Sequence, residues 1–439
     1  MAFELDPTFA QDPSKHFNTL QVHAGWSPDP TTGSAALPIY ASAAFEFKDA
    51  EDGAAKFALS RPGNVYGRLT NTTTDAIAAR IAAVEGATGA VAVASGHAAE
   101  ILALTNLVGA GDEIVASDSL YGGTWNICLH TLGDLGVKTT FVENTAIDAF
   151  VAATTPKTKL WYVETIGNPL VDVADVPAIV EAANSLPSPV PVFVDNTFAT
   201  PYLYRPAEDG AAVVIESLTK WIGGHGATLG GAVVDTGKFD WKQDPEKWHT
   251  LAKPDPSYHG LVFADAAPAA PFATRVLANK LRDFGPTLSP YAAQLIGLGI
   301  EDLSLRVQRH SDNALAVANY LKSNPKVSWV RYSGLEDDPS HEVASRILQH
   351  GFGGVVVFGV KGGREAGLKV VDNVRLFTHL ANVGDAKSLI IHPASTTHSQ
   401  LTAAQLEAAH LSEDLVRLSV GIEDVDDIIA DLDQALAKA

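Results

Sequence analysis

The chain has 439 residues, and its 51 Asp and Glu residues outnumber its 31 Lys and Arg residues, which gives a net charge of −20 at pH 7. Hydrophobic residues make up 46% and charged residues 19%, which is typical of a globular protein with a large buried core and excludes a disordered or fibrous chain. The acidic balance argues against binding to nucleic acid or to anionic membranes, although it permits a local basic pocket for a small anion.

Cys128 is the only cysteine, so the chain can form neither an internal disulfide nor a cysteine-based metal site. The first ten residues are acidic and lack the basic-then-apolar layout of a secretion signal. No apolar run approaches the ~18–20 residues that a membrane span needs. We therefore expect a cytoplasmic protein with no membrane partner.

Residues 1 to about 70 are rich in Pro, Gly, Thr and aromatic residues and show little periodicity, so they predict an irregular arm rather than a compact domain. The pattern changes at Asp75. Ile77, Ile81 and Val84 follow at helical spacing, and Gly86 is a stop signal, which predicts a helix over 75–85.

Short apolar runs then alternate with stretches of helical periodicity. This alternation predicts an α/β fold with a mostly parallel sheet covered on both faces, in which ligands bind beyond the carboxyl ends of the strands. The predicted strands are 90–94, 113–117, 160–163, 190–194 and 211–215, and the predicted helices between them include 98–107 and 176–185.

Residues 236–275 interrupt the alternation of strands and helices, because they are rich in aromatic residues and prolines. We predict that they form an inserted segment with little regular structure. From residue 290 a long amphipathic helix is predicted to reach about residue 322. Strands are predicted at 354–360 and 415–420, and a closing helix at 423–437. These elements predict a second, smaller α+β domain.

Two polar residues at predicted strand ends carry the strongest chemical signal. Lys220 follows a buried strand and precedes a glycine-rich stretch; burial lowers the pKa of a lysine, and a neutral amine can attack a carbonyl. Asp195 follows another strand, where a carboxylate can pair with a protonated pyridine ring nitrogen. Each residue taken alone also has a structural interpretation, namely a lysine that extends to water and a helix N-cap.

Several other residues at these ends suit an anion or a flat ring. Ser95, Gly96 and His97 open a helix, whose free N–H groups attract phosphate, with His97 contributing its backbone. Ser217 and Thr219 share one face in extended chain and could hold phosphate oxygens. Tyr121 could stack on a flat ring or could be a turn residue. Tyr66 and Arg68 could bind a phosphate or could be surface residues. Arg417 could bind a substrate carboxylate or form an internal salt bridge.

Other chemistries lack their signatures. His225, His392 and His398 do not have metal-ligand spacing, so no metal site is predicted. No Walker A, GxGxxG or GxSxG motif is present, which argues against nucleotide hydrolysis, dinucleotide redox chemistry and serine hydrolysis.

The motifs taken together resemble the Cys/Met-metabolism group of fold-type I pyridoxal-phosphate enzymes over roughly residues 17–437. The resemblance implies an arm at 1–70 that reaches the neighbouring subunit's site, a cofactor-binding domain at 71–297 and a C-terminal domain at 298–439. The motifs, in order, are VYGR, SGHAA, LYGGTW, ETIGNP, DNTFATP, SLTKWIGGHG, HPASTTHSQL and VRLSVGIED.

The resemblance also implies a role for each candidate. Lys220 would form the Schiff base with pyridoxal 5'-phosphate and act as the catalytic base, and Tyr121 would stack on the ring and assist proton transfer. Asp195 would pair with the ring nitrogen, with Thr197 beside it, and Asn168 would lie near the ring hydroxyl. The phosphate would be held by Ser95, Gly96, His97, Ser217 and Thr219, with Tyr66 and Arg68 of an adjacent subunit, and the substrate by Arg417, Asn382 and Tyr66.

Within this group the chain is most similar to O-acetylhomoserine sulfhydrylases. The stretch PSYHGLVF (256–263) resembles theirs, and so does the stretch around Asn382, where many lyases have a serine. The implied reaction is γ-replacement, in which O-acetylhomoserine and sulfide or methanethiol are the substrates and homocysteine and acetate form from the sulfide reaction. The implied assembly is a homotetramer built from dimers.

Alternatives within the same fold are an O-succinylhomoserine sulfhydrylase, a cystathionine γ-synthase or a γ-lyase. An alternative of another class is a non-catalytic regulator, against which the intact Lys220, Asp195 and Arg417 argue. Two positions depart from the group: Gly67 stands where Ser or Thr is usual, and Asn71 is followed by Thr72 instead of Pro. These departures concern the path of the arm and remove no chemical group.

Overall fold

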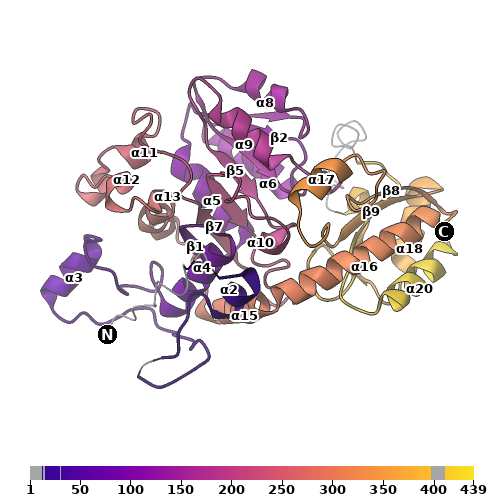
Figure 1. The fold of residues 1–439 in the computed structure, drawn as a ribbon, viewed down its shortest axis with the longest axis horizontal. Coiled ribbons are helices and arrows are strands. Elements are labelled where there is room, and N and C mark those ends of the chain that lie inside the picture. Colours follow the sequence, from indigo (N-terminus) through magenta and orange to yellow (C-terminus); the bar gives the residue numbers. More distant parts are fainter. Residues whose placement is uncertain (1–11, 13–14, 30, 397–410) are drawn as a thin grey trace.

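A computed structural model describes residues 12, 15–29, 31–396 and 411–439 of the chain. It contains a seven-stranded and a five-stranded sheet, with helices packed against both (Figure 1). The predicted α/β class, with a sheet domain and a smaller α+β part, is therefore confirmed.

The larger sheet has the strand order β1-β7-β6-β5-β4-β2-β3. Strands β3, β2, β4, β5 and β6 run parallel, and β7 is antiparallel to both β6 and β1. Strand β1 consequently points the same way as the parallel set. The strands are β1 (Gly89–Val93), β2 (Glu113–Ser117), β3 (Lys138–Val142), β4 (Thr158–Glu164), β5 (Val192–Asp195), β6 (Val213–Glu216) and β7 (Gly231–Asp235).

Five of these strands lie within two residues of the predicted ones at each end, but β3 and β7 were not predicted. Strand β3 reads KTTFV and is only half-buried, so it lacks the apolar run that marks the others. Strand β7 follows a glycine-rich turn, and its pairing with β1 and β6 depends on a return of the chain that no local pattern specifies.

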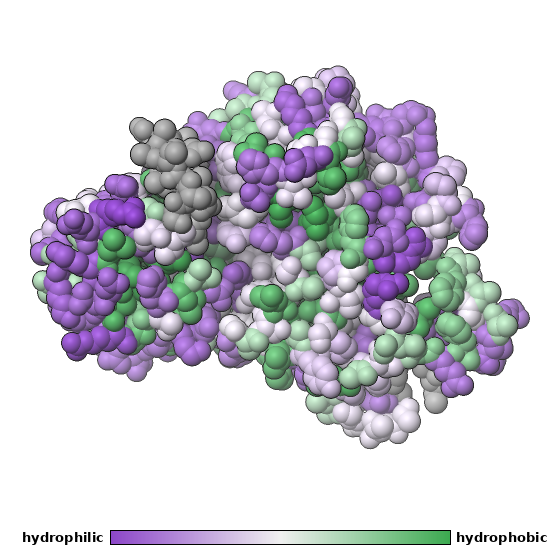
Figure 2. Space-filling view, turned by 180° about the vertical axis from the view of Figure 1, so that it is seen from behind, coloured by the Kyte–Doolittle hydropathy of each residue, from purple (hydrophilic) through white to green (hydrophobic). Residues whose placement is uncertain are grey.

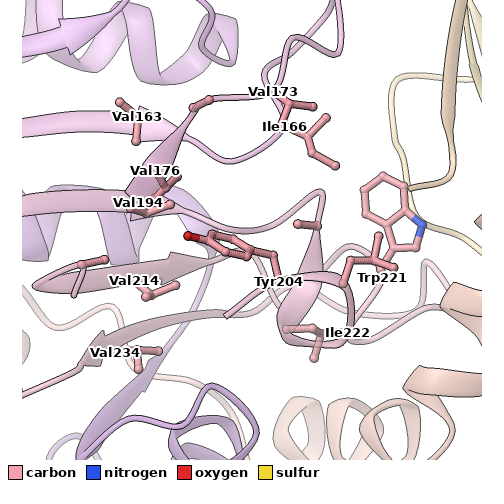
Figure 3. Close-up of a cluster of buried hydrophobic side chains, with 14 of the residues drawn as sticks. Val163, Ile166, Val173, Val176, Val194, Tyr204, Val214, Trp221, Ile222 and Val234 are labelled. Carbon is pink, nitrogen blue, oxygen red and sulfur yellow. The ribbon is translucent and has the colours of Figure 1, made fainter. Parts of the chain in front are cut away.

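Helices cover both faces of this sheet, and two separate hydrophobic clusters form the cores beneath them. Figure 3 shows part of one core, in which Val163, Val194, Val214 and Val234 come from four neighbouring strands. The helices around the sheet are α4 (Thr72–Val84), α5 (Gly96–Leu107), α6 (Gly122–Asn126), α7 (Leu132–Asp134), α8 (Ile147–Ala153), α9 (Val176–Asn184) and α10 (Thr200–Leu203), with a π-helical turn η1 (Ile127–Thr131).

The arm contains two short helices, α2 (Phe17–His23) and α3 (Ala50–Phe57), and is otherwise irregular. Helix α2 packs on α4 through Leu20 and Ala24, whereas α3 lies far from both sheets, at the left of Figure 1. Outside these two helices, the described part of the arm is irregular, as expected.

The predicted lack of regular structure over residues 236–275 is wrong. Aromatic side chains that include Trp241, Trp248 and Phe272 pack together there and join a core of the sheet domain, which stabilises several short helices. They are α11 (His249–Ala252), the 3-10 turn η2 (Pro256–Tyr258), α12 (Phe263–Ala266) and α13 (Pro271–Arg275), followed by the π-helical η3 (Val276–Leu281) and α14 (Arg282–Phe284).

The single helix predicted from residue 290 is two helices, α15 (Pro290–Glu301) and α16 (Leu303–Ser323), which break at Asp302. The Arg306 guanidinium explains the break, because it binds the Asp302 carboxylate at 2.7 Å and also the carbonyls of Gly299, Trp221 and Ile222. The helix is thus interrupted where the Arg306 side chain binds carbonyls of a distant turn.

The smaller sheet has the order β10-β11-β12-β9-β8 and packs on α16, α18 and α20. Its strands are β8 (Val327–Arg331), β9 (Val355–Val360), β10 (Thr378–His379), β11 (Leu389–Ile391) and β12 (Leu415–Ser419). The remaining helices are α17 (His341–Ile347), α18 (Gly363–Asn373), the 3-10 turn η4 (Pro393–Ser395) and α20 (Val425–Leu436).

Candidate active site

The carboxyl ends of β1, β2, β4, β5 and β6 meet at one edge of the larger sheet, and the candidate residues lie at this edge. Asp195 is the last residue of β5, Lys220 follows β6, and Tyr121 follows β2. Arg417 of the smaller sheet lies at the same place, because the charge of Arg417 changes the pKa of both Lys220 and Tyr121. Residues almost 300 positions apart therefore form one site.

Lys220 lies in a turn four residues beyond β6, and its Nζ donates a hydrogen bond to Asn382 Oδ1 at 2.6 Å. Burial lowers the pKa of this lysine to about 8, and repulsion from Arg417 acts in the same direction, while the Asp195 carboxylate opposes both. A substantial fraction of the amine is consequently uncharged near neutral pH, as a nucleophile or base requires.

Asp195 is a half-buried carboxyl whose pKa is raised by desolvation, against the hydrogen bonds from Thr197 and the charge of Lys220. The Thr197 backbone N–H donates to Asp195 Oδ1 at 2.9 Å, which is a local turn and not a helix cap. Thr197 Oγ1 in turn accepts from the Ser217 N–H at 2.8 Å. Thr197 therefore connects Asp195 to Ser217 through hydrogen bonds to both.

Groups that suit an anion lie at the N-terminus of α5. Ser95 caps this helix, since its Oγ accepts from the Ala98 N–H at 3.1 Å, and the N–H groups of Gly96 and His97 lie in the first turn, which has no intrahelical acceptor for them. A Cβ at Gly96 would lie 2.8 Å from Ser217 Cβ, so only glycine lets the two segments approach this closely.

Ser217 and Thr219 lie in a turn, and not in the extended chain that their spacing predicted. Thr219 Oγ1 is 3.2 Å from the Gly230 carbonyl and 3.0 Å from the Gly230 N–H. The turn nevertheless holds the Ser217 hydroxyl beside the first turn of α5, because Ser217 lies against Gly96.

The Tyr121 ring is half-exposed at the site and stacks on the His97 ring, with centroids 5.5 Å apart and planes at 25°. Burial and the nearby Glu100 raise the pKa of Tyr121. The alternative of an isolated turn tyrosine does not describe this arrangement. The His97 side chain, for which only a backbone role was predicted, is also part of the site.

Two buried carboxyls at the site, Glu164 and Glu100, were given no role from the sequence, although Glu164 lies at a predicted strand end. Glu164 accepts from the Tyr121 N–H at 2.6 Å and is the register partner of Asp195 across β4 and β5. Glu100 accepts from Thr124 Oγ1 at 2.8 Å, and burial together with the charge of Asp195 raises its pKa to about 8. The only signal in the sequence was that Glu164 directly follows an apolar run and that Glu100 is charged within an apolar helix.

Arg417 is buried in β12, a strand that is buried on both faces. Its Nη1 donates to Asn168 Oδ1 at 2.8 Å, and burial lowers its pKa to about 10. Across the described ranges of the chain, no carboxylate forms an ion pair with Arg417, so the internal salt bridge that the sequence left open is not found there. A buried guanidinium without an anionic partner fits a site for a carboxylate ligand.

The two arm candidates lie elsewhere. The Arg68 guanidinium stacks over the Tyr66 ring at 5.1 Å, and the Arg68 carbonyl accepts from Thr287 Oγ1 at 2.7 Å. In the parts of the chain that the structure describes, neither side chain hydrogen-bonds to Lys220 or to the hydroxyls near α5. Arg68 lies in a turn, and Gly67 is required there because a Cβ would be 2.8 Å from the Ser42 carbonyl oxygen.

The remaining histidines have structural surroundings. His225 is exposed and bonds the Gly223 carbonyl, and His392 bonds Ser395 Oγ and the Glu413 carbonyl. His398 lies outside the described residues. The described residues include no group of three potential metal ligands, and none of their helices has the length and apolar character to cross a bilayer.

The site's functional groups fit pyridoxal phosphate. The half-buried Asp195 carboxyl suits a pyridinium nitrogen, and the Lys220 amine suits an aldehyde. The N-terminus of α5 suits a phosphate. A Cβ at Gly231 would lie 2.1 Å from the Ser95 carbonyl oxygen, so glycine lets β7 approach the start of α5 closely.

A family model described as "Cys/Met metabolism PLP-dependent enzyme" matches residues 18–437. The chain belongs to this family. Pyridoxal phosphate is therefore the cofactor of this Cys/Met metabolism enzyme, and both the predicted family and the predicted cofactor are confirmed.

Relatives within the family have related names. The chain is 47% identical to the homocysteine synthase of Schizosaccharomyces pombe, with 97% of this chain and 99% of that protein covered. It is 46% identical to the O-acetyl-L-homoserine sulfhydrylase of Leptospira meyeri, with 95% and 96% covered.

A solved structure of a Campylobacter jejuni protein assigned as an O-acetylhomoserine (thiol)-lyase has a TM-score of 0.92 to this chain. It shares 37% identity, with 96% of this chain and 100% of that chain covered, and it contains a pyridoxyl group on a lysine. The fold of the Cys/Met metabolism enzymes is thus present over almost the whole chain.

Proposed function

We propose that the protein catalyses γ-replacement, in which O-acetylhomoserine and hydrogen sulfide give homocysteine and acetic acid. The observation that carries this proposal is Arg417, a buried guanidinium that has no carboxylate partner among the described residues and lies close enough to Lys220 to lower the pKa of that lysine. This arrangement suits an α-amino acid, whose carboxylate binds the arginine while its α-carbon faces the lysine. The names of the two curated relatives support the same reaction.

Each residue of the site has a proposed task. Bound pyridoxal phosphate supplies an electron sink for the carbon next to the substrate amine. The Asp195 carboxylate keeps the ring nitrogen protonated, and Ser95, Gly96, His97, Ser217 and Thr219 bind the phosphate, with Thr197 holding Asp195 and Ser217 in place.

The substrate is oriented by Arg417, with Asn168 as its hydrogen-bond partner. The Lys220 amine removes the α-proton, and Asn382 holds that amine by a 2.6 Å hydrogen bond. Tyr121 would lie against the ring and assist proton transfer. A β-proton and acetate leave the substrate, sulfide adds at the γ-carbon, and protons return to the β- and α-carbons to give homocysteine.

We also propose that the working unit is a homotetramer of dimers in the cytoplasm, in which Tyr66 and Arg68 complete the phosphate pocket of a neighbouring subunit. The position of these two side chains, away from the Lys220 group of their own chain, supports a shared site. The arm around α3 projects away from the two sheets and their helices and exposes apolar side chains, as Figure 2 shows at the right of the view.

The test compares homocysteine formation from sulfide with O-acetyl- and O-succinyl-homoserine on the cofactor-loaded protein. We expect strong product from the acetyl ester and at least about a thousandfold loss in a Lys220→Ala variant, because that variant lacks the base. A Lys242→Ala variant, which removes an exposed lysine far from the site, is the matched control.

Other outcomes assign the sister activities. Product from the succinyl ester alone would make the protein an O-succinylhomoserine sulfhydrylase, and cystathionine formation from cysteine would make it a cystathionine γ-synthase. Release of a ketoacid from cystathionine or methionine, with no homocysteine from either ester, would make it a γ-lyase.

A further inference from the structure

The loop between β4 and α9, residues 165–175, carries Asn168 and folds back on itself. Ile166 bridges to Val173, and the Gly167 N–H donates to the Asp172 carbonyl at 2.8 Å. Both apolar side chains belong to the core cluster that contains Trp221, as Figure 3 shows. The base of the loop is therefore anchored, and Asn168 lies at its tip, where it binds Arg417.

The Asp172 carboxylate on this loop bridges two other parts of the molecule. Its Oδ1 accepts from Arg331 Nη2 at 2.6 Å, and its Oδ2 accepts from Ser119 Oγ at 3.2 Å. Arg331 belongs to β8 of the smaller sheet, and Ser119 lies two residues before Tyr121. One carboxylate thus connects the C-terminal sheet, the Asn168 loop and the Tyr121 turn.

The partners of Asp172 are themselves held in place. Arg331 Nε also binds Asp338 at 3.0 Å, and the Asp338 side chain is completely buried. The loop packs tightly on the Ser119 turn, because a Cβ at Gly167 would lie 2.6 Å from the Ser119 carbonyl oxygen. The side chains of Asp172 and Arg331 are only 25% and 20% exposed, so this ion pair is less screened than a surface pair.

We infer that Asp172 is a positioning residue for the amino-acid substrate: through Arg331 and Ser119 it fixes the loop so that Asn168 orients Arg417 and the turn presents Tyr121. This inference rests on the proposed function and deepens it, since it names what holds the carboxylate-binding pair. Asp172 itself does not touch the reacting atoms. Its loss should weaken substrate binding more than it slows the chemical steps.

The same loop offers a matched control. Asp175 forms an ion pair with Arg346 of α17, so it also joins the loop to the C-terminal part, but it is not bonded to Ser119. Asp175 caps α9 by accepting from the Ala178 N–H, and asparagine retains a capping oxygen. Asp175→Asn thus removes one charge pair between the loop and α17 without disturbing the Tyr121 turn.

The experiment measures kcat and KM for O-acetylhomoserine in the cofactor-loaded wild type, Asp172→Asn and Asp175→Asn. We expect Asp172→Asn to raise KM about tenfold with kcat within about twofold, because an ion pair and not a reacting group is lost. Asp175→Asn should change KM less than about twofold. A KM that is unchanged in Asp172→Asn, or raised equally in both variants, would overturn the inference.

A second measurement separates this inference from the proposed reaction. L-2-aminobutyrate has no leaving group, and its dissociation constant can be read from the cofactor absorbance of each variant. We expect weaker binding in Asp172→Asn alone, even if the wild type makes no homocysteine. Should Asp172→Asn fail to fold, Ser119→Ala cuts the same bridge at its other end, and unaltered affinity in that variant would refute the positioning role.

Discussion

Arg417 and Lys220 place two basic side chains in one site, and the charge of Arg417 acts on Lys220. The positive charge of Arg417 adds to the effect of burial in lowering the pKa of Lys220 to about 8. Arg417 has an amide partner, Asn168, and no carboxylate within the described ranges. A site that holds two such groups close together is arranged to receive an anion between them.

The first prediction concerns Arg417→Gln. We expect kcat/KM for O-acetylhomoserine to fall about a hundredfold, since a hydrogen bond to a charged group is worth about 1.5–3 kcal/mol and each tenfold change is about 1.4 kcal/mol. Steady-state kinetics with the ester and sulfide measures this loss.

The same variant also reports on Lys220. In cofactor-free protein, the rate of recombination with pyridoxal phosphate rises with pH as the amine loses its proton. Removing the Arg417 charge raises the pKa of Lys220, so the midpoint of this rise should move to a higher pH than in the wild type. A shift to lower pH would contradict the proposed electrostatic coupling.

At the scale of elements, a buried pair of acids joins α4 to β6. Glu85 directly follows α4, and Glu216 is the last residue of β6. Asn196, the residue after β5, donates a hydrogen bond from its Nδ2 to Glu85 Oε1 at 3.4 Å. Burial raises the pKa of both, Glu85 to about 7, and the charge of Glu85 acts in the same direction on Glu216. The pair lies directly behind Asp195 and Ser217.

The second prediction follows from these raised pKa values. A carboxyl whose pKa is higher in the folded than in the unfolded chain contributes stability below its unfolded value of 4.5, and this contribution is lost as the pH rises through the folded value. The unfolding free energy of the cofactor-free protein should therefore fall between about pH 4.5 and 7, by up to about 1.4 kcal/mol per pH unit for each titrating group.

Urea unfolding measured across this pH range tests the pair. A Glu216→Gln variant, which mimics the protonated acid, should show a flatter profile, and the exposed Glu246→Gln, whose charge does not act on the pair, should match the wild type. If Glu216→Gln leaves the profile as steep as before, other groups are responsible for the pH dependence.

At the scale of the whole molecule, the described chain exposes apolar surface that a single copy does not cover. Tyr291, Leu295, Leu298 and Leu305 are spaced four, three and seven residues apart along α15 and α16, and all four are exposed. Phe57 and Leu59 on the arm are exposed as well. Such surface supports the proposed assembly from copies of this chain, because monomers rarely expose large apolar patches.

The third prediction tests whether sites are shared between subunits. Lys220→Ala and Arg68→Ala should each be almost inactive as pure proteins. After joint unfolding and refolding of equal amounts, about a quarter of the wild-type activity should return, because half of the dimers are mixed and each of these has one intact site of two. No recovery in a mixture that forms mixed dimers, as seen by mass, would show that each site is built from one chain.

Much of the larger sheet could be predicted from the sequence because its strands are apolar runs with clear boundaries. The edge strand β3 and the antiparallel β7 could not, since β3 has two threonines and a lysine and the pairing of β7 is a long-range event. The break at Asp302 was missed for the same reason, because the Arg306 contacts that cause it come from a distant turn.

The residue types of the site and their order can be read from the linear sequence, and their resemblance to a family also implies the fold and the cofactor. Chemistry that depends on residue identity, such as the Lys220 amine and the Asp195 carboxylate, is visible in a linear motif. The surroundings of these groups depend on the folded arrangement of the chain. This arrangement placed Glu100 and Glu164 beside Asp195, left Arg417 without a carboxylate among the described residues, and joined Asp172 to Arg331 and Ser119. Burial and charge proximity arise from contacts between segments that are tens to hundreds of residues apart, and no local pattern encodes them.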